Sequence, residues 1–260
     1  MKTTERPYQE MMINSKYLEV PRRTYQRELN PMRVQKIAAE FDEHIANEPK
    51  VSLRDGHYYV FDGQHTIAAR KFRNGGNDLP IRCKVYRGMT ESEEALLFAQ
   101  QTGASAILGA GAKVRALIFG GDPEAINFMK DTESVGIRLD YGQQRGKARI
   151  GCIATALGEY RKVGPDRYKE ALKLIIDAWG GCPDSMRAET ILGMTRFVDL
   201  YHEEYDPKRM VKQMKKSDPV KIFRDGHAMC CNMPGYKKYL YQVFDIYNGK
   251  SKKYALPMKF

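Results

Sequence analysis

Apolar and polar residues follow several different spacings along the first 105 residues, which predicts a small domain of mixed helices and strands. Apolar residues recur at helical spacing from Met32 to Ile45, directly after Asn30-Pro31, a pair typical of a helix start. Two β-rich runs, Val51–Leu53 and Tyr58–Phe61, flank an Asp-Gly turn and predict a hairpin. The same reasoning adds a helix over 66–72, a strand over 79–86 and, from a capping-box pattern that begins at Thr90, a helix over 90–101.

The remaining residues have mostly helical periodicity. Pro and Gly clusters separate the predicted helices, which span 112–119, 123–135, 147–162, 166–179, 184–204, 207–216 and 235–248. A link rich in Gly, Ala and Ser, Gly103–Gly111, divides the two patterns. We therefore expect an α+β chain, with an α/β domain over 1–105 followed by an all-α domain over 106–260.

Charge changes this picture by separating the two halves. The 260 residues carry 43 Lys and Arg against 32 Asp and Glu, a formal net charge of +11. Residues 1–105 hold 16 basic and 14 acidic residues, a net of +2, whereas residues 106–260 hold 27 and 18, a net of +9. An excess of this kind indicates an acidic partner such as nucleic acid, or only a lysine-rich solvated surface.

Composition also bears on the compartment. No run approaches the roughly 20 apolar residues of a membrane span, and the N-terminus has no apolar secretory segment. The five cysteines are odd in number and scattered, which favours reduced thiols. We expect a cytoplasmic protein of a bacterium or a phage-infected host, without a membrane partner.

The sharpest local motif is Asp62-Gly63-Gln64-His65-Thr66, between the predicted hairpin and a helix. A glycine permits a tight reversal there, and the free N–H groups and dipole of a helix start attract anions. Thr66 and His65 offer further donors, and Arg70 lies one turn along the same face as Thr66. The motif predicts a phosphate site. The alternative is an ordinary turn in which Asp62 caps the helix and His65 lies on the surface.

Several segments in order resemble the ParB/sulfiredoxin superfamily over about residues 15–105. Asp62-Gly63-Gln64-His65 is similar to the DGQHR or DGQQR signature of that superfamily, and Tyr25-Gln26-Arg27 is similar to the YQR element that precedes it. Pro49–Leu53 resembles the entry into the first hairpin strand. Residues 106–260 look like the helical extension of a ParB-like group found in actinobacterial and phage genomes.

The resemblance implies a ParB-like fold and a site for a nucleoside triphosphate, CTP or ATP, with or without Mg²⁺. It carries the phosphate loop onto Gly63, Gln64, His65 and Thr66, with Arg27 and Arg70 as charge partners. Thr66 replaces the signature arginine, so the bidentate phosphate contact of that residue is lost. Gln64 stands where sulfiredoxin has its cysteine nucleophile and ParB has a glutamate, which argues against sulfiredoxin activity and vigorous hydrolysis.

Two basic segments of the second half are candidates for contact with a nucleic-acid backbone. One is the loop with Arg145, Lys147 and Arg149, expected to enter a helix. The other is one face of the helix 207–216, with Lys208, Lys212, Lys215 and Lys216. In both cases the alternative is a solvated surface. No metal site is expected, because Cys230-Cys231 near His227 has no second ligand pair at zinc spacing.

Three hypotheses follow. The first is a nucleotide-binding, DNA-associated ParB-like protein, whose homo-oligomeric state the sequence leaves open. The second is an enzyme of the same fold, either an NTP hydrolase or phosphotransferase or a metal-dependent nuclease. In it, His65 acts as acid or base beside Asp62, and Glu93 and Glu94 are the other carboxylates available to a metal. The third is a non-catalytic interaction module of a phage or mobile element.

Overall fold

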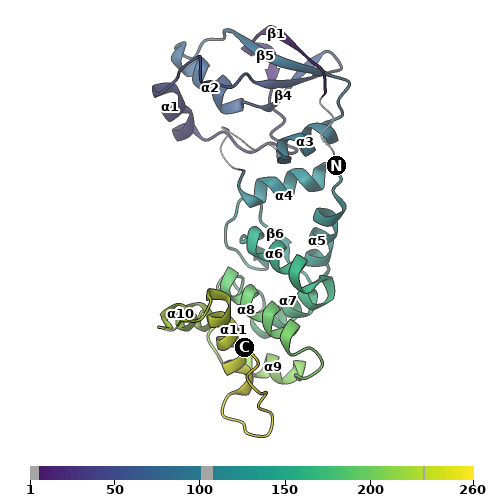
Figure 1. Cartoon of the computed structure of the whole chain (residues 1–260), viewed down its shortest axis with the longest axis vertical. Helices are drawn as coiled ribbons and strands as arrows, with labels where there is room; N and C mark the ends of the chain where they lie inside the picture. The colour runs from purple at the N-terminus through teal and green to yellow at the C-terminus, as the bar shows by residue number, and fades with distance from the viewer. Residues whose placement is uncertain (1–5, 101–107, 231) are drawn as a thin grey trace. The chain divides into compact units, whose positions relative to one another are not determined.

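The structure is a computed structural model that describes residues 6–100, 108–230 and 232–260 (Figure 1). The chain divides into two compact units, Met1–Pro123 and Glu124–Phe260. This division falls later than the expected boundary at residue 105, because the helix Ala110–Phe119 packs within the first unit. Residues 103–107 of the predicted link lie outside the described residues.

The first unit contains a mixed five-stranded sheet of order β1-β5-β3-β4-β2. β1 pairs antiparallel with β5, β5 pairs parallel with β3, and the β3–β4 hairpin is antiparallel. The short β2 closes the sheet beside β4 in parallel. The strand bounds are Tyr8–Asn14 (β1), Leu18–Glu19 (β2), Lys50–Arg54 (β3), His57–Asp62 (β4) and Pro80–Arg87 (β5).

The predicted hairpin and helices of this unit are confirmed, except that the helix expected to reach Ile45 ends at Ala39. Asp55 and Gly56 have φ values of 48° and 81°, the positive values that a two-residue type I′ turn needs. The side chain of Asn30 accepts a bond from the backbone N–H of Arg33, and Thr90 and Glu93 form the capping box. The helices are Pro31–Ala39 (α1), Gln64–Arg73 (α2), Glu91–Gln100 (α3) and Ala110–Phe119 (α4).

Two main hydrophobic clusters fix these elements. One lies within the sheet and against α2, and includes Val51, Val60, Ile81 and Ile67. The other joins the end of β4 to α3 and α4, and includes Tyr25, Phe61 and Phe98. A smaller cluster packs α1 on α2 through Val34, Ala38 and Ala69. The end of β4 and the start of α2 therefore lie where all three clusters meet.

The second unit is mostly helical, as predicted. The pair β6 and β7 and the helix α10 were not expected from the sequence. The bounds are Pro123–Ser134 (α5), Arg138–Leu139 (β6), Arg149–Ile150 (β7), Ile153–Val163 (α6), Pro165–Trp179 (α7), Ala188–Leu200 (α8), Pro207–Met214 (α9), Lys221–Ala228 (α10) and Gly235–Asn248 (α11). The described residues include no helix with the length and apolar character needed to cross a bilayer.

Candidate anion-binding pocket

The turn that enters α2 depends on Gly63. This residue is the N-cap of α2 with φ of 94°, a left-handed conformation that L side chains rarely adopt. A Cβ on Gly63 would also lie 2.9 Å from the Cα of Pro49, closer than real contacts allow. Having no side chain, Gly63 offers no cap for the first N–H groups of the helix, which the pocket residues Gln64, His65 and Thr66 carry. The expectation that Asp62 caps this helix is therefore wrong.

A network of amide side chains brings the Tyr25-Gln26-Arg27 segment to this turn. Gln26 is buried, and its Nε2 donates to the carbonyl oxygens of Val60 and Phe61 at 3.2 and 3.0 Å. The Nε2 of Gln64 donates to the backbone oxygen of Arg27 at 3.1 Å and to Oε1 of Gln26 at 3.4 Å. These bonds set the backbone position of Arg27 beside the start of α2.

A buried carboxylate anchors the same segment from the other side. Glu94 is fully buried in α3, accepts a bond from the Tyr25 hydroxyl at 2.9 Å and is paired with Nε of Arg54 at 2.8 Å. Burial and the neighbouring Glu94 raise the pKa of Tyr25 well above its usual range, so the hydroxyl keeps its proton and donates. The bonds of Tyr25 and Gln26 thus fix the chain directly before Arg27, and the bond from Gln64 fixes the backbone of Arg27 itself.

His65 positions a second cation that the sequence patterns did not indicate. Its side chain is buried, and its Nε2 accepts a bond from the backbone N–H of Asn30 at 3.2 Å. Asn30 caps α1, and Arg33 lies in the first turn of that helix. Burial, with Arg27 and Arg33 nearby, lowers the pKa of His65 to about 4, so the imidazole is neutral at pH 7. The expectation of a surface histidine is wrong.

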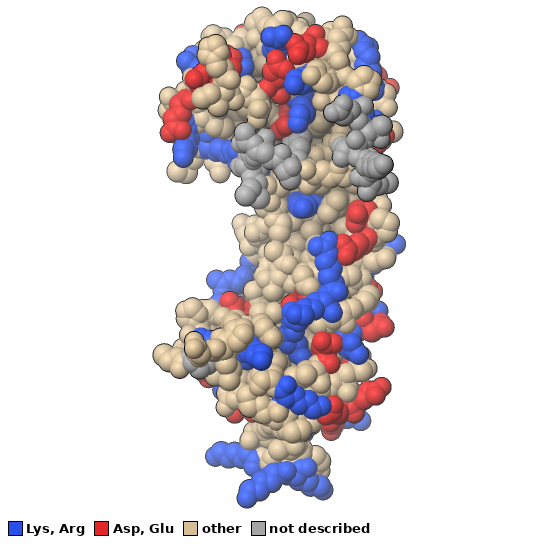
Figure 2. All heavy atoms as spheres, in the orientation of Figure 1, with Lys and Arg blue, Asp and Glu red and all other residues tan. Residues whose placement is uncertain are grey.

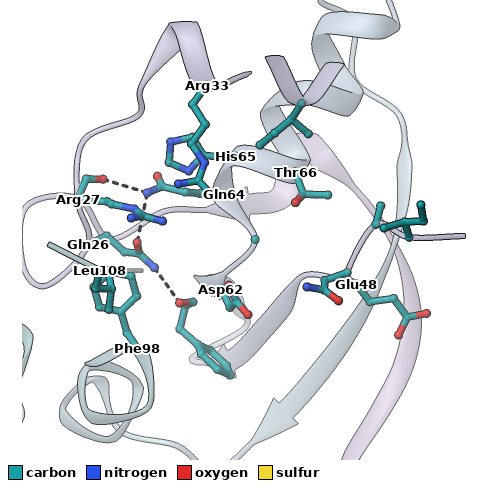
Figure 3. Close-up of a pocket in the computed structure, with 16 residues that line it drawn as sticks. Gln26, Arg27, Arg33, Glu48, Asp62, Gln64, His65, Thr66, Phe98 and Leu108 are labelled. Atoms are coloured by element: carbon teal, nitrogen blue, oxygen red, sulfur yellow. Dashed lines mark hydrogen bonds between the residues drawn. The ribbon is translucent and has the colours of Figure 1, made fainter. Parts of the chain in front are cut away.

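These residues line one pocket of about 240 Å³ (Figure 3). Arg27, Arg33, Gln64 and His65 lie together on one side, and Glu48 lies across from them. Phe61, Phe98, Ile37, Ile45 and Leu108 supply apolar wall. Four of the residues predicted for the phosphate loop, Gly63, Gln64, His65 and Thr66, therefore share one pocket with Arg27.

The positive side of the pocket has unmet bonding capacity. Among the described residues, neither Arg27 nor Arg33 forms an ion pair with an acid, and Nε of Arg27 and Oε1 of Gln64 are buried without a hydrogen-bond partner. Burial lowers the pKa of Arg27, and the charge of Arg33 lowers it further, although Asp62 opposes this effect. Two cations that repel one another beside an uncapped helix start favour a bound anion.

Arg70, predicted as a charge partner of the phosphate loop, is not a lining residue. Its guanidinium is paired with Glu43 at 2.7 Å and lies over the ring of Phe41. The backbone of α2 turns Arg70 toward the loop after α1, which it holds against the helix. Arg22 and Arg23, in the segment upstream of Arg27, are exposed and also lie outside the pocket lining.

Each of the three carboxylates considered as metal ligands is bonded to a different set of residues. Glu93 closes the capping box of α3 and is paired with Arg6, whereas Glu94 is buried between Tyr25 and Arg54. Asp62 lies at the end of β4, with Lys50 at 3.4 Å. In the part of the chain that the structure describes, no three His, Cys, Asp or Glu residues are grouped as metal ligands.

The basic loop of the second unit does not enter a helix as expected. Arg149 belongs to the short strand β7, and α6 begins only at Ile153. Arg145 lies 3.9 Å from Asp184, and Arg149 lies 3.8 Å from Asp140, whereas Lys147 is exposed. Two of the three predicted contacts are therefore partly neutralised within the unit.

The helix predicted over 207–216 ends at Met214, so Lys208 and Lys212 lie in α9, whereas Lys215 is its C-cap and Lys216 lies in the turn that follows. Met210 and Met214 are fully buried, whereas Lys208, Lys212, Lys215 and Lys216 are exposed. None of these four lysines forms an ion pair with an acid of the described residues. Figure 2 shows basic side chains gathered as well where the loop after α11 lies. In α11, which covers the helix predicted over 235–248, Leu240, Val243 and Tyr247 are core residues.

His227 lies in α10, and Cys230 lies just after that helix. Cys230 is exposed with a free thiol, and the ring of His227 is stacked on that of Phe223. Cys231 lies outside the described residues.

Arg33 is the main site residue that the sequence patterns do not single out. A weak signal exists: Arg33 is a cation in the first turn of a helix, where the dipole disfavours positive charge. A residue placed against this preference indicates a role beyond helix stability. Its approach to Gln64 and His65, which are 31 and 32 residues away along the chain, becomes visible only in the folded unit.

Comparison with known proteins places the chain in a family. The family described as "Family of unknown function (DUF6551)" matches residues 20–260, and the chain belongs to it. No curated protein and no solved structure matches the chain.

Proposed function

We propose that the protein binds a nucleotide through its phosphate in the pocket at the start of α2. The observation that carries this proposal is the pair Arg27 and Arg33, which face one pocket without an acidic partner among the described residues. Guanidinium groups and free helix N–H groups are the donors that bind phosphate in proteins. The apolar residues of the same pocket suit a base or sugar.

The resemblance to the ParB/sulfiredoxin superfamily supports the same ligand class. Its two motifs, Tyr25-Gln26-Arg27 and Asp62-Gly63-Gln64-His65, lie far apart in the chain and are joined by the bonds from Gln26 and Gln64. In this proposal the first unit is a ParB-like nucleotide-binding domain. We propose binding rather than turnover, because Nε2 of His65 already accepts a hydrogen bond from the backbone N–H of Asn30 and is not free to take a proton from a bound ligand.

Calorimetric titration of the full chain with nucleotides of all four bases tests the proposal. Arg27→Gln should weaken binding by roughly tenfold or more, because it removes a charge-assisted bond. Arg23→Gln is the matched control: it removes the same charge from the same segment, but Arg23 is exposed and outside the pocket. Absence of heat with every nucleotide, or equal weakening by both variants, would refute the proposal.

We further propose that the second unit contacts a nucleic-acid backbone through α9. The specific observation is that Lys208, Lys212, Lys215 and Lys216 are exposed and carry no ion pair with a described acid. Because Met210 and Met214 hold the opposite face in the core, Lys208 and Lys212 are presented on one side of a fixed helix, and Lys215 and Lys216 follow directly after it. Unpaired lysines on one rigid face are typical of phosphate-backbone contact.

A further inference from the structure

We infer that the pocket selects a nucleoside monophosphate over the corresponding di- or triphosphate. This inference rests on the proposed function and concerns the number of phosphates that the site accepts. It is carried by the distribution of charge around the pocket, by its volume and by two of its buried atoms, Nε of Arg27 and Oε1 of Gln64, which have no hydrogen-bond partner among the described residues.

The cationic charge of the pocket matches one phosphate. Among the described lining residues, Arg27 and Arg33 are the basic side chains that carry charge at pH 7, because the lowered pKa of His65 keeps that ring neutral. A phosphate monoester carries about −1.5 to −2 at pH 7. Two guanidinium groups therefore balance a single phosphate at the start of α2.

Further phosphates would meet unfavourable surroundings. The lining acids are Asp62, whose charge acts on Arg27 and which immediately precedes the helix start, and Glu48, which lies across the pocket from the arginines. Ile37, Phe98 and Leu108 supply apolar wall, beside the neutral polar residues Gln26 and Asn47. Each additional phosphate adds negative charge beside a carboxylate or buries charge against hydrocarbon, and both are unfavourable.

Volume and hydrogen bonding favour a compact ligand with a hydroxyl or amino group close to its phosphate. The pocket volume of about 240 Å³ lies below the roughly 300–1,000 Å³ of pockets that hold drug-sized ligands. Nε of Arg27 needs an acceptor, which a phosphate oxygen supplies. Oε1 of Gln64 needs a donor, because the Nε2 bonds to Arg27 and Gln26 fix the orientation of the amide. A ribose hydroxyl or a base amino group is such a donor.

The test is calorimetric titration of the full chain with the mono-, di- and triphosphates of each base, once in EDTA and once with Mg²⁺. For the base that binds best, we expect the monophosphate to bind at least about fivefold more tightly than the triphosphate under both conditions. Asp62→Asn should reduce this difference in affinity, because it removes a negative charge from the pocket lining. Glu40→Gln, at an exposed position after α1, is the matched control and should leave the difference unchanged.

A triphosphate that binds as tightly as the monophosphate, in EDTA or with Mg²⁺, overturns this inference and leaves the proposed nucleotide site standing. A difference that Asp62→Asn and Glu40→Gln change equally overturns the role given to Asp62. Absence of binding by every nucleotide refutes the proposed function itself.

Discussion

At the scale of single residues, the pocket depends on three residues whose conformation or surroundings are unfavourable for folding stability. Gly63 adopts a left-handed backbone against Pro49, Arg33 lies at the positive end of a helix dipole, and the imidazole of His65 is buried beside two cations. Each arrangement opposes stability by itself. All three meet at one pocket, which is the pattern expected of a binding site rather than of a purely structural turn.

Gly63→Ala should lower the free energy of unfolding by about 1–3 kcal/mol, because the variant combines an unfavourable φ with a clash against Pro49. Gly76→Ala is the control, since Gly76 has a φ of 85° but no atom within 4 Å of a Cβ. Urea denaturation measures both. A loss for Gly63→Ala no larger than that for Gly76→Ala would contradict the close approach to Pro49.

The pKa of His65, lowered to about 4 from its usual 6.5, makes stability depend on pH. Above pH 6.5 the His65 ring is neutral in both the folded and the unfolded chain, and the free energy of unfolding keeps its full value. As the pH falls from 6.5 toward 4, the unfolded chain takes up the proton first, and the free energy of unfolding decreases. The loss should be on the order of 1–3 kcal/mol. His65→Gln keeps an acceptor for Asn30 and should flatten this part of the unfolding profile, whereas His44→Gln, at an exposed loop position, should keep the wild-type slope.

At the scale of elements, the site is the junction of β4, α2, α1 and the segment before α1. Local patterns predict most of these elements: the Asp-Gly turn predicts the hairpin, and Asn30-Pro31 predicts the start of α1. The strand β1 is harder to predict, because Gln9 and Glu10 interrupt its apolar pattern. β1 exists because its backbone pairs with β5 along seven residues, a partner that lies about 70 residues away in the chain.

The same limit applies to the candidate site. Arg27 and the loop Gly63–Thr66 can be predicted from the sequence, because each belongs to a short continuous motif. Arg70 has suitable chemistry and helical spacing, but the fold directs it to Glu43. Arg33 and the buried bond between Tyr25 and Glu94 depend on tertiary packing, which local spacing does not encode.

The bond between Tyr25 and Glu94 gives a test at this scale. Tyr25→Phe removes the donor and leaves Glu94 paired with Arg54 alone, so we expect the free energy of unfolding to fall by about 1–2 kcal/mol. Nucleotide affinity should also fall, since Arg27 loses one of its anchors. Tyr17→Phe, at an exposed position, should change neither quantity. Wild-type affinity in a destabilised Tyr25→Phe protein would show that the anchor does not position Arg27.

At the scale of the whole molecule, the net charge of +11 is consistent with two separate anion-binding sites, one proposed in each unit. One unit supplies a pocket with two arginines that form no ion pair within the described part of the chain, and the other supplies exposed lysines on α9 and directly after it. The pocket is the chemically more specific of the two sites. Its lining places two arginines beside a helix start, and it contains two buried atoms that have no hydrogen-bond partner among the described residues. The second depends on charge and exposure, so its test must separate α9 from the general basic character of the protein.

Replacement of the four lysines on and directly after α9 by glutamine should weaken binding to duplex DNA and reduce the dependence of log K on log salt concentration by up to about 3.6, or 0.9 for each lost phosphate contact. The control removes the same total charge at exposed lysines elsewhere, Lys16, Lys36, Lys113 and Lys130. Fluorescence anisotropy across a salt series measures both. Equal changes in the two variants would assign binding to net charge and remove α9 from the proposal.

The role proposed for Arg27 and Arg33 is to bind the phosphate of a nucleotide at the start of α2. Its sharpest test is the nucleotide affinity of the full chain with Arg33→Gln, compared with Lys36→Gln, which removes a charge from the exposed face of the same helix. We expect a loss of roughly tenfold or more for Arg33→Gln and wild-type affinity for Lys36→Gln. Wild-type affinity in the Arg33→Gln protein would rule out this role for Arg33.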